Sequence, residues 1–266
     1  MKFIKAIVYS NLWIAFGASC FTASTYLMLG LSINYSYLLL VFFASLFAYN
    51  YQRLVRINQL LPPVSERQEW IKQHQKIIRV LTLFAFVLSC AILLFDFTLD
   101  DAFKLFPALF IVLLYATFFI NQKFGLRDVP GLKIFLIASV WAYVLGVFPL
   151  IDVCPQKELI YLFTDKFLFI LAITIPFDIR DFYKDNASQK TIPQIIGVNA
   201  SKVLALLFLT LSFFIHYNFF KVNQLALISY FLLVGLLILF ANPNRKELYF
   251  SFWIDGVLVL SQLVFY

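Results

Sequence analysis

The sequence predicts an all-α membrane protein, a polytopic bundle of nine transmembrane helices. The 266 residues are 62% hydrophobic and only 13% charged, and their mean hydropathy is +0.88. Nine apolar stretches are each long enough, or nearly so, to cross about 30 Å of hydrocarbon. Basic residues fall almost entirely in alternate connections between these stretches. A soluble domain of this size would not tolerate such a composition at its surface, so soluble fold classes are excluded.

The apolar stretches follow one another along the whole chain. They are Val8–Leu31, Tyr35–Asn50, Ile77–Phe95, Phe103–Ile120, Leu132–Ile151, Leu159–Phe177, Val203–Phe220, Leu225–Ala241 and Leu248–Tyr266. No small-residue cleavage site closes a short apolar segment near the N-terminus, so we expect a retained helix rather than a signal peptide. Residues 1–266 are therefore expected to form a single transmembrane domain, with longer polar connections near 51–76 and 178–202.

The distribution of charge predicts the orientation in the membrane. Most of the 21 Lys and Arg residues lie at the N-terminus and in the second-to-third, fourth-to-fifth, sixth-to-seventh and eighth-to-ninth connections. The opposite side holds only Lys104, Lys157, Lys166 and Lys221. By the positive-inside rule we expect a cytoplasmic N-terminus and a C-terminus outside. Membrane topology thus explains the net charge of +7, and no nucleic-acid partner is expected.

An acidic stretch directly follows the sixth apolar run. It reads Asp178-Ile179-Arg180-Asp181-Phe182-Tyr183-Lys184-Asp185. If the helix continues through it, Asp178, Asp181 and Asp185 project from one face over roughly 10 Å. Such a ladder repels itself unless a cation binds, and Mg²⁺ takes one or two carboxylates together with water and phosphate oxygens. The alternative is an ordinary polar loop that happens to be acidic.

These features resemble the UbiA superfamily of membrane prenyltransferases. The resemblance rests on Asp178-x-x-Asp181-x-x-x-Asp185, on Lys190-Thr191-Ile192-Pro193 and Gly197 after it, and on Pro130-Gly131-Leu132-Lys133 before a helix with Trp141. Nine spans with cytoplasmic polar loops match as well, so the resemblance covers essentially the whole chain. It implies helices around a central cavity and Mg²⁺-dependent transfer from a prenyl diphosphate to a lipophilic acceptor, an aromatic compound or quinone precursor, on the cytoplasmic side.

The resemblance also implies a second Asp-rich motif, at the end of the second span. Where the family has Asn-Asp-x-x-Asp-x-x-x-Asp, this chain has Asn50, with Tyr51, Leu54 and Asn58 in place of the carboxylates. This half therefore cannot bind Mg²⁺ as the family does.

Two explanations of the replaced motif stay open, and both concern Arg53 and Arg56. The two arginines share a helix face and can bind phosphate oxygens bidentately, which would substitute for part of the metal's role. Alternatively they only satisfy the positive-inside rule and extend to the headgroups, in which case the site is weakened or lost.

The predicted site residues fall into two sets. Those expected to act in catalysis and to hold Mg²⁺ are Asp178, Asp181 and Asp185. Those expected to bind the diphosphate are Asn50, Arg53, Arg56, Lys123, Arg127, Lys133, Lys190 and Tyr115. For the basic members the alternative is a purely topogenic charge, and for Tyr115 an interfacial tyrosine. Asp255 lies inside the last span and is expected to face the bundle with a partner, whereas His74 and His216 lack a second metal ligand and are expected to be structural.

Two other functions remain open at this point. A non-catalytic membrane protein on the same fold, binding lipid or a protein partner, would explain the replaced first motif. A transporter is also possible, since ionisable clusters mark substrate pathways, although the acidic stretch lies at a membrane edge rather than the midplane. The direction of Arg53 and Arg56, toward the carboxylates or toward the headgroups, discriminates the enzyme from the scaffold.

Overall fold

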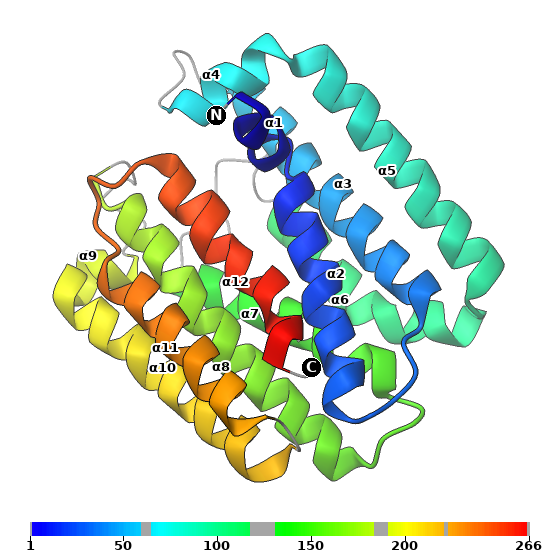
Figure 1. Ribbon diagram of the computed structural model, residues 1–266. Coiled ribbons are helices and arrows are strands. Elements are labelled where there is room, and N and C mark those ends of the chain that lie inside the picture. Colours follow the sequence, from blue (N-terminus) through cyan, green and yellow to red (C-terminus); the bar gives the residue numbers. More distant parts are fainter. Residues whose placement is uncertain (1, 60–64, 118–130, 184–190, 221–222, 265–266) are drawn as a thin grey trace.

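The computed structural model describes residues 2–59, 65–117, 131–183, 191–220 and 223–264. Within these ranges all regular structure is helical (Figure 1). The first part contains α1 (Lys2–Tyr9), α2 (Leu12–Met28), α3 (Tyr35–Gln59), α4 (Glu66–Gln73), α5 (Gln75–Asp96), α6 (Leu99–Thr117) and α7 (Leu132–Ala142). The π-helix η2 (Tyr143–Val147) and the 3₁₀-helix η3 (Phe148–Leu150) extend α7. The remainder contains α8 (Gln156–Arg180), α9 (Ile192–Ile196), α10 (Val198–Phe219), α11 (Gln224–Leu239), the π-helix η5 (Tyr249–Ile254), α12 (Asp255–Leu260) and η6 (Ser261–Val264).

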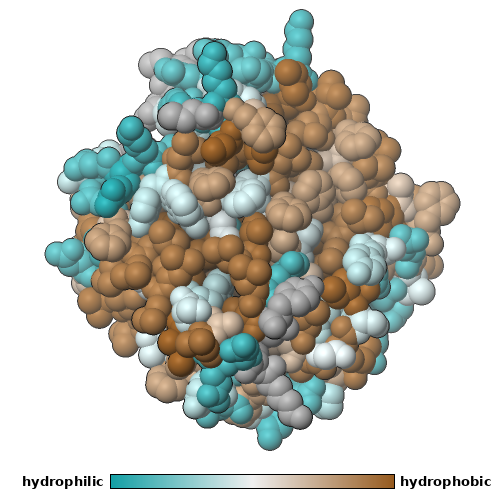
Figure 2. Space-filling model, viewed as in Figure 1, coloured by the Kyte–Doolittle hydropathy of each residue, from teal (hydrophilic) through white to brown (hydrophobic). Residues whose placement is uncertain are grey.

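Five of the described helices are long and apolar enough to cross a membrane, or six if the bent pair α1 and α2 is counted as one span. The segments Gln224–Leu239 and Tyr249–Val264 are apolar but shorter. Apolar side chains cover the middle of the face in Figure 2, and polar side chains gather toward its ends. The predicted all-α membrane fold is therefore confirmed, whereas the count of nine spans stays a prediction.

Helix α8 forms the centre of the bundle. In the most apolar 18-residue segment of α8, 56% of the residues are buried inside the protein. In the other four long spans the buried share is 22% to 39%. It packs against α7 and α10, while α2 packs against α3 and α12. Aromatic side chains from several helices join at its middle, where the Phe169 ring stacks on Phe21 and on Tyr230. Because α8 is so enclosed, any polar residue on it needs a partner from a neighbouring helix.

The first helix lies across one end of the bundle. Helices α1 and α2 meet at an angle of 65°, and Asn11 between them has φ 63°, a left-handed conformation that asparagine tolerates better than most residues. Its side chain donates to Asn50 Oδ1 at 2.7 Å and accepts from Arg67. The bend brings α1 against α4, where the Tyr9 hydroxyl donates to Glu66 at 3.2 Å.

The π-helix η2 has an identifiable local cause. Pro149 has no N–H, so it cannot donate to the carbonyl of Leu145 in an α-helix or to that of Val144 in a π-helix. Both carbonyls instead accept hydrogen bonds from other helices: Leu145 from the Thr25 hydroxyl at 2.9 Å, and Val144 from the Tyr37 hydroxyl at 2.5 Å. The widened turn is thus fixed to α2 and α3.

Gly146 in this π-helix makes room for a buried lysine. A Cβ at position 146 would lie 2.9 Å from Cγ of Lys166, in the middle of the lysine stem. We predict that Gly146→Ala destabilises the protein by about 1–3 kcal/mol, the usual cost of overpacking a core, measured as thermal unfolding in detergent. Gly235→Ala is the matched control, because its Cβ would meet its nearest neighbours at 3.6 and 3.7 Å, an ordinary contact distance. Equal effects of the two changes would contradict this account.

Candidate active site

The acidic stretch begins inside α8 and continues beyond its end. The helix ends at Arg180, and Asp181 follows it in a turn. The helix therefore does not continue through the whole stretch, although the Asp181 N–H still donates to the Phe177 carbonyl at 3.1 Å. The single-face ladder, which includes the undescribed Asp185, stays a prediction. The helix dipole gives a physical reason, because carboxylates are unfavourable at a helix C-terminus, where a basic residue such as Arg180 is favoured. Asp185 lies outside the described residues.

Asp178 pairs with a lysine from a different part of the chain. Its side chain is almost fully buried, and Lys133 Nζ lies 3.1 Å from its Oδ1. Lys133 sits in the first turn of α7, directly after Gly131, whose φ of 72° turns the chain into the helix. The structure thus joins two predicted site residues, one assigned to metal and one to diphosphate.

A second group of charges lies at the same end of α8. Arg180 donates to both oxygens of Asp181, from Nε at 3.0 Å and from Nη2 at 2.6 Å. Its Nη1 donates to Glu247 Oε1 at 3.0 Å. Arg67 Nη1 lies 3.6 Å from the same glutamate oxygen. We refer to Arg53, Arg67, Arg180, Asp181 and Glu247 as the arginine cluster.

Arg53 is directed to this cluster. It interacts electrostatically with Arg67 and Arg180 and with the carboxylates of Glu247 and Asp181. Burial alone would raise the pKa of Glu247, but the guanidinium groups of Arg180, Arg67 and Arg53 hold it below its ordinary value. Glu247 is therefore ionised. Arg53 lies within electrostatic range of the other two arginines and of both carboxylates, and its choice between a bound phosphate and the headgroups stays a prediction. The side chain of Arg56 lies outside the described part of the structure.

Asn50 and Asp255 connect the cluster to the rest of the bundle. Asn50 is fully buried; its amide donates to the Ser10 carbonyl at 3.0 Å and its Oδ1 accepts from Asn11. Its contact with diphosphate stays a prediction. To make that contact, the Asn50 side chain would have to break its hydrogen bonds with Ser10 and Asn11. Asp255 interacts electrostatically with Arg67 and Arg180, in agreement with the expectation that it faces the bundle with a partner.

The remaining predicted residues are not joined to the site in the described structure. Tyr51, which replaces the first carboxylate of the degenerate motif, is exposed, and its ring stacks on Phe47 at 5.7 Å. Lys123, Arg127 and Lys190 lie outside the described residues, as does the side chain of Tyr115.

The carboxylates of this end do not fit a divalent metal in their present pairing. Asp178 is bound by Lys133 and Asp181 by Arg180. Among the described residues no group of three or more His, Cys, Asp or Glu side chains is arranged to hold a metal. A Mg²⁺ ion at Asp178 and Asp181 would therefore have to displace two basic partners.

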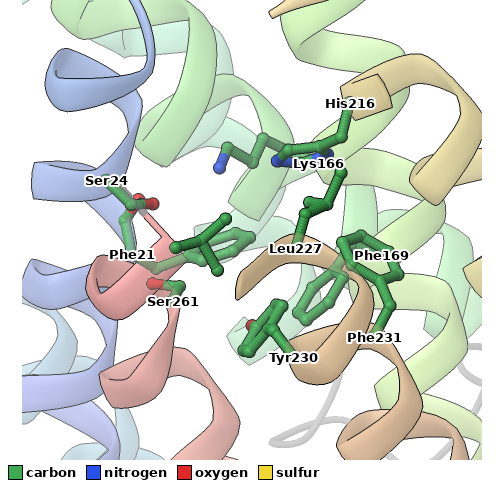
Figure 3. Close-up of a pocket in the computed structure, with 10 residues that line it drawn as sticks. Phe21, Ser24, Lys166, Phe169, His216, Leu227, Tyr230, Phe231 and Ser261 are labelled. Atoms are coloured by element: carbon green, nitrogen blue, oxygen red, sulfur yellow. The ribbon is translucent and has the colours of Figure 1, made fainter. Parts of the chain in front are cut away.

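A second polar cluster, in the interior of the bundle, was not predicted. Two of its members, Lys166 and His216, are shown in Figure 3 with the cavity that they line. Asp165 is fully buried and Lys166 is 1% exposed. Asp165 Oδ1 accepts from Ser212 at 2.6 Å and lies 2.8 Å from His216 Nδ1, both on α10. Lys166 Nζ lies 3.9 Å from the centre of the Phe21 ring. Lys166 and His216 line a cavity of about 10 Å³ with Phe21 and Tyr230.

The assignment of Lys166 to the charges of the outer surface is therefore wrong. Its side chain points into the bundle because Gly146 leaves space for its stem. The adjacent charges Asp165 and Lys166 within an apolar run were the available sequence signal, since such residues face the interior of a membrane bundle. The partners on α10 could not be identified from the sequence.

The described bundle of apolar helices, with the arginine cluster at one end, defines an all-α integral membrane protein. Its fold is similar to that of digeranylgeranylglyceryl phosphate synthase in membranes, a solved structure aligned over 99% of this chain and 97% of that chain with a TM-score of 0.55. The two sequences are 14% identical, so the likeness shows the fold alone. No protein-family profile and no curated protein sequence matches the chain.

Proposed function

We propose that this protein transfers a prenyl group from a prenyl diphosphate to a lipophilic acceptor, on the side of the membrane predicted to be cytoplasmic. The observation that carries the proposal is the Lys133–Asp178 pair beside the arginine cluster, at one end of an apolar bundle. The shared fold with digeranylgeranylglyceryl phosphate synthase supports it. An apolar interior suits a prenyl chain, and the cationic groups at its end suit a diphosphate.

The proposed reaction is a displacement at the allylic carbon of the donor. The C–O bond to the diphosphate breaks, and its electron pair leaves with the diphosphate. A nucleophilic atom of the acceptor forms the new bond to that carbon and then releases its proton to a base. Lys133, Arg53 and Arg180 would stabilise the charge that develops on the leaving group, and they do so more strongly in a water-poor site.

The metal and the other predicted ligands remain part of the proposal. Mg²⁺ held by Asp178, Asp181 and Asp185 would neutralise charge on the leaving diphosphate, but the present pairing of the first two carboxylates does not fit it, so no step depends on it here. The predicted contacts of the diphosphate with Asn50, Arg56, Lys123, Arg127, Lys190 and Tyr115 likewise stay proposals.

A non-catalytic lipid-binding protein on the same fold is the second candidate. The ion pairs of the site favour this candidate. Asp178, Asp181 and Glu247 each have a basic partner within the protein, so the site has less need of a charged ligand. The replaced carboxylates at Tyr51, Leu54 and Asn58 point the same way. This candidate leaves the partly buried Lys133–Asp178 pair without a function beyond structure.

Binding and turnover together distinguish the two candidates. The purified chain in lipid nanodiscs would be offered prenyl diphosphates of several lengths with membrane lipids and aromatic acceptors, with Mg²⁺ or with a chelator. We expect the protein to release diphosphate and to form a prenylated product. Because a metal requirement is predicted, the chelator should abolish both diphosphate release and product formation. Binding of prenyl lipids without any turnover would favour the non-catalytic candidate. Absence of both binding and turnover would refute the proposed enzyme.

A further inference from the structure

Three arginines from distant parts of the chain converge on one carboxylate. Arg53 comes from α3, Arg67 from α4 and Arg180 from the end of α8, and each acts electrostatically on Glu247. Glu247 lies just before η5, in the connection that follows α11. Its side chain is 12% exposed, so this convergence takes place largely away from water.

The Glu247 carboxylate is bound by guanidinium groups in the way that a phosphate oxyanion would be bound. One oxygen, Oε1, accepts from Arg180 Nη1 at 3.0 Å and from the Ser251 hydroxyl at 3.1 Å, and Arg67 Nη1 is 3.6 Å away. The planar guanidinium fork matches carboxylate and phosphate oxygens alike. The carboxylate therefore stands where a phosphate oxygen would be bound.

The cluster has more donor capacity than Glu247 uses. Arg67 is 5% exposed, and its Nε has no hydrogen-bond partner among the described residues. Its Nη2 donates to the carbonyl of Val8 at 3.3 Å and to Asn11, so the position of its guanidinium is fixed. A buried donor without an acceptor is costly, and a ligand with several oxygens could satisfy it.

The charges of the cluster show what loss of Glu247 would do. Arg53, Arg67 and Arg180 face the carboxylates of Asp181, Glu247 and Asp255. Without Glu247, the three guanidinium charges would outnumber their counter-charges in a poorly solvated place, which favours the uptake of an external anion.

We propose that Arg53, Arg67 and Arg180 form a binding site for a phosphate oxyanion, and that Glu247 is its internal occupant, which must turn aside before the oxyanion binds. The competition with Glu247 selects for ligands of more than one negative charge, so a diphosphate is preferred over a monophosphate. The inference relies on the proposed function only for the natural ligand, the diphosphate end of a prenyl donor; binding of the oxyanion itself is independent of any turnover.

The test compares the full chain with Glu247→Gln, a neutral variant of nearly the same shape, in nanodiscs of zwitterionic lipid. Calorimetry with inorganic pyrophosphate is expected to show at least about tenfold tighter binding to the variant, equivalent to about 1.4 kcal/mol. Orthophosphate is expected to bind more weakly than pyrophosphate to both proteins. The matched control is Glu69→Gln, which removes an exposed carboxylate on α4; its affinity should equal that of the unaltered protein.

Two further measurements keep the result decisive. If Glu247→Gln is unstable, pyrophosphate should raise its unfolding temperature more than that of the unaltered chain, and an added Arg180→Met change should abolish this difference. If anionic lipid in the nanodisc removes the added affinity, the site is supported and a lipid headgroup is identified as a competing source of the oxyanion. Equal or weaker pyrophosphate binding by Glu247→Gln, without any added thermal shift, overturns the inference.

The outcomes for the two proposals are separable. A protein that binds pyrophosphate more tightly after Glu247→Gln but never turns over prenyl diphosphates keeps the oxyanion site and loses the proposed function. A protein that prenylates an acceptor while Glu247→Gln leaves pyrophosphate affinity unchanged keeps the function and loses the internal occupant.

Discussion

Replacement of Asp178 by asparagine is expected to lower the rate of prenyl transfer by about 100-fold or more, the scale seen when one charged or hydrogen-bonding group is removed from a site that stabilises developing charge. The carboxylate is buried and fixes the ammonium group of Lys133 at 3.1 Å. An amide of the same shape would bind that ammonium group only through a weaker, uncharged acceptor, and it would also remove a carboxylate ligand from any metal bound there. Initial rates with a saturating prenyl diphosphate measure the effect.

An Asp–Lys pair at the other end of the bundle provides the control. Asp152 accepts from Lys104 Nζ at 2.6 Å, but its side chain is 61% exposed. Exposed ion pairs contribute little, so Asp152→Asn should leave turnover and stability nearly unchanged. Turnover of Asp178→Asn at the unaltered rate would remove the acidic stretch from the active site.

The largest loss of stability is expected from Asp165→Ala. Removing one partner of a buried ion pair typically costs about 3–5 kcal/mol, because the charge left behind has no compensation. Asp165 is fully buried, lies 2.8 Å from His216, and interacts electrostatically with Lys166. Unfolding of the purified protein in mixed micelles, followed by tryptophan fluorescence, measures the change.

A double replacement distinguishes charge from shape at this position. Asp165→Leu combined with Lys166→Met removes both charges while keeping apolar volume, and such replacements are often neutral or stabilising. We therefore expect the double variant to be more stable than Asp165→Ala. Glu158→Gln, near the start of the same helix, should have little effect because its side chain lies near the membrane edge. A double variant as unstable as Asp165→Ala would indicate that hydrogen bonds to Ser212 and His216, rather than charge, carry the stability.

The fold class was predictable because hydropathy acts over long stretches. Segments such as residues 77–95 and 203–220 are too apolar to be exposed to water, and in hydrocarbon a helix satisfies its own backbone. The bend at Asn11 and the π-helix at 143–147 were not predictable in the same way. The first depends on contacts with Asn50 and Arg67. The second has a local cause in Pro149, but the hydroxyl groups of α2 and α3 that donate to the freed carbonyls come from distant parts of the chain.

The candidate site was predictable in its residue types but not in its pairing. The acidic stretch and Lys133 were identified from the sequence, yet their ion pair joins residues 45 positions apart. Arg67 and Glu247 were missed because nothing in their local sequences distinguishes them from topogenic loop charges. Only the tertiary fold brings Glu247, just before η5, to Arg180 at the end of α8 and to Arg67 on α4.

The buried charges of α8 also have a consequence for the order of biosynthesis. An aspartate or a lysine at the centre of a lone membrane helix costs roughly 2.5–3.5 kcal/mol, so these two charges make the entry of α8 into lipid by itself less favourable. Its partners Ser212 and His216 lie on α10, which is synthesised later. We therefore expect α8 to reach its most stable position only after the chain has been made past residue 216.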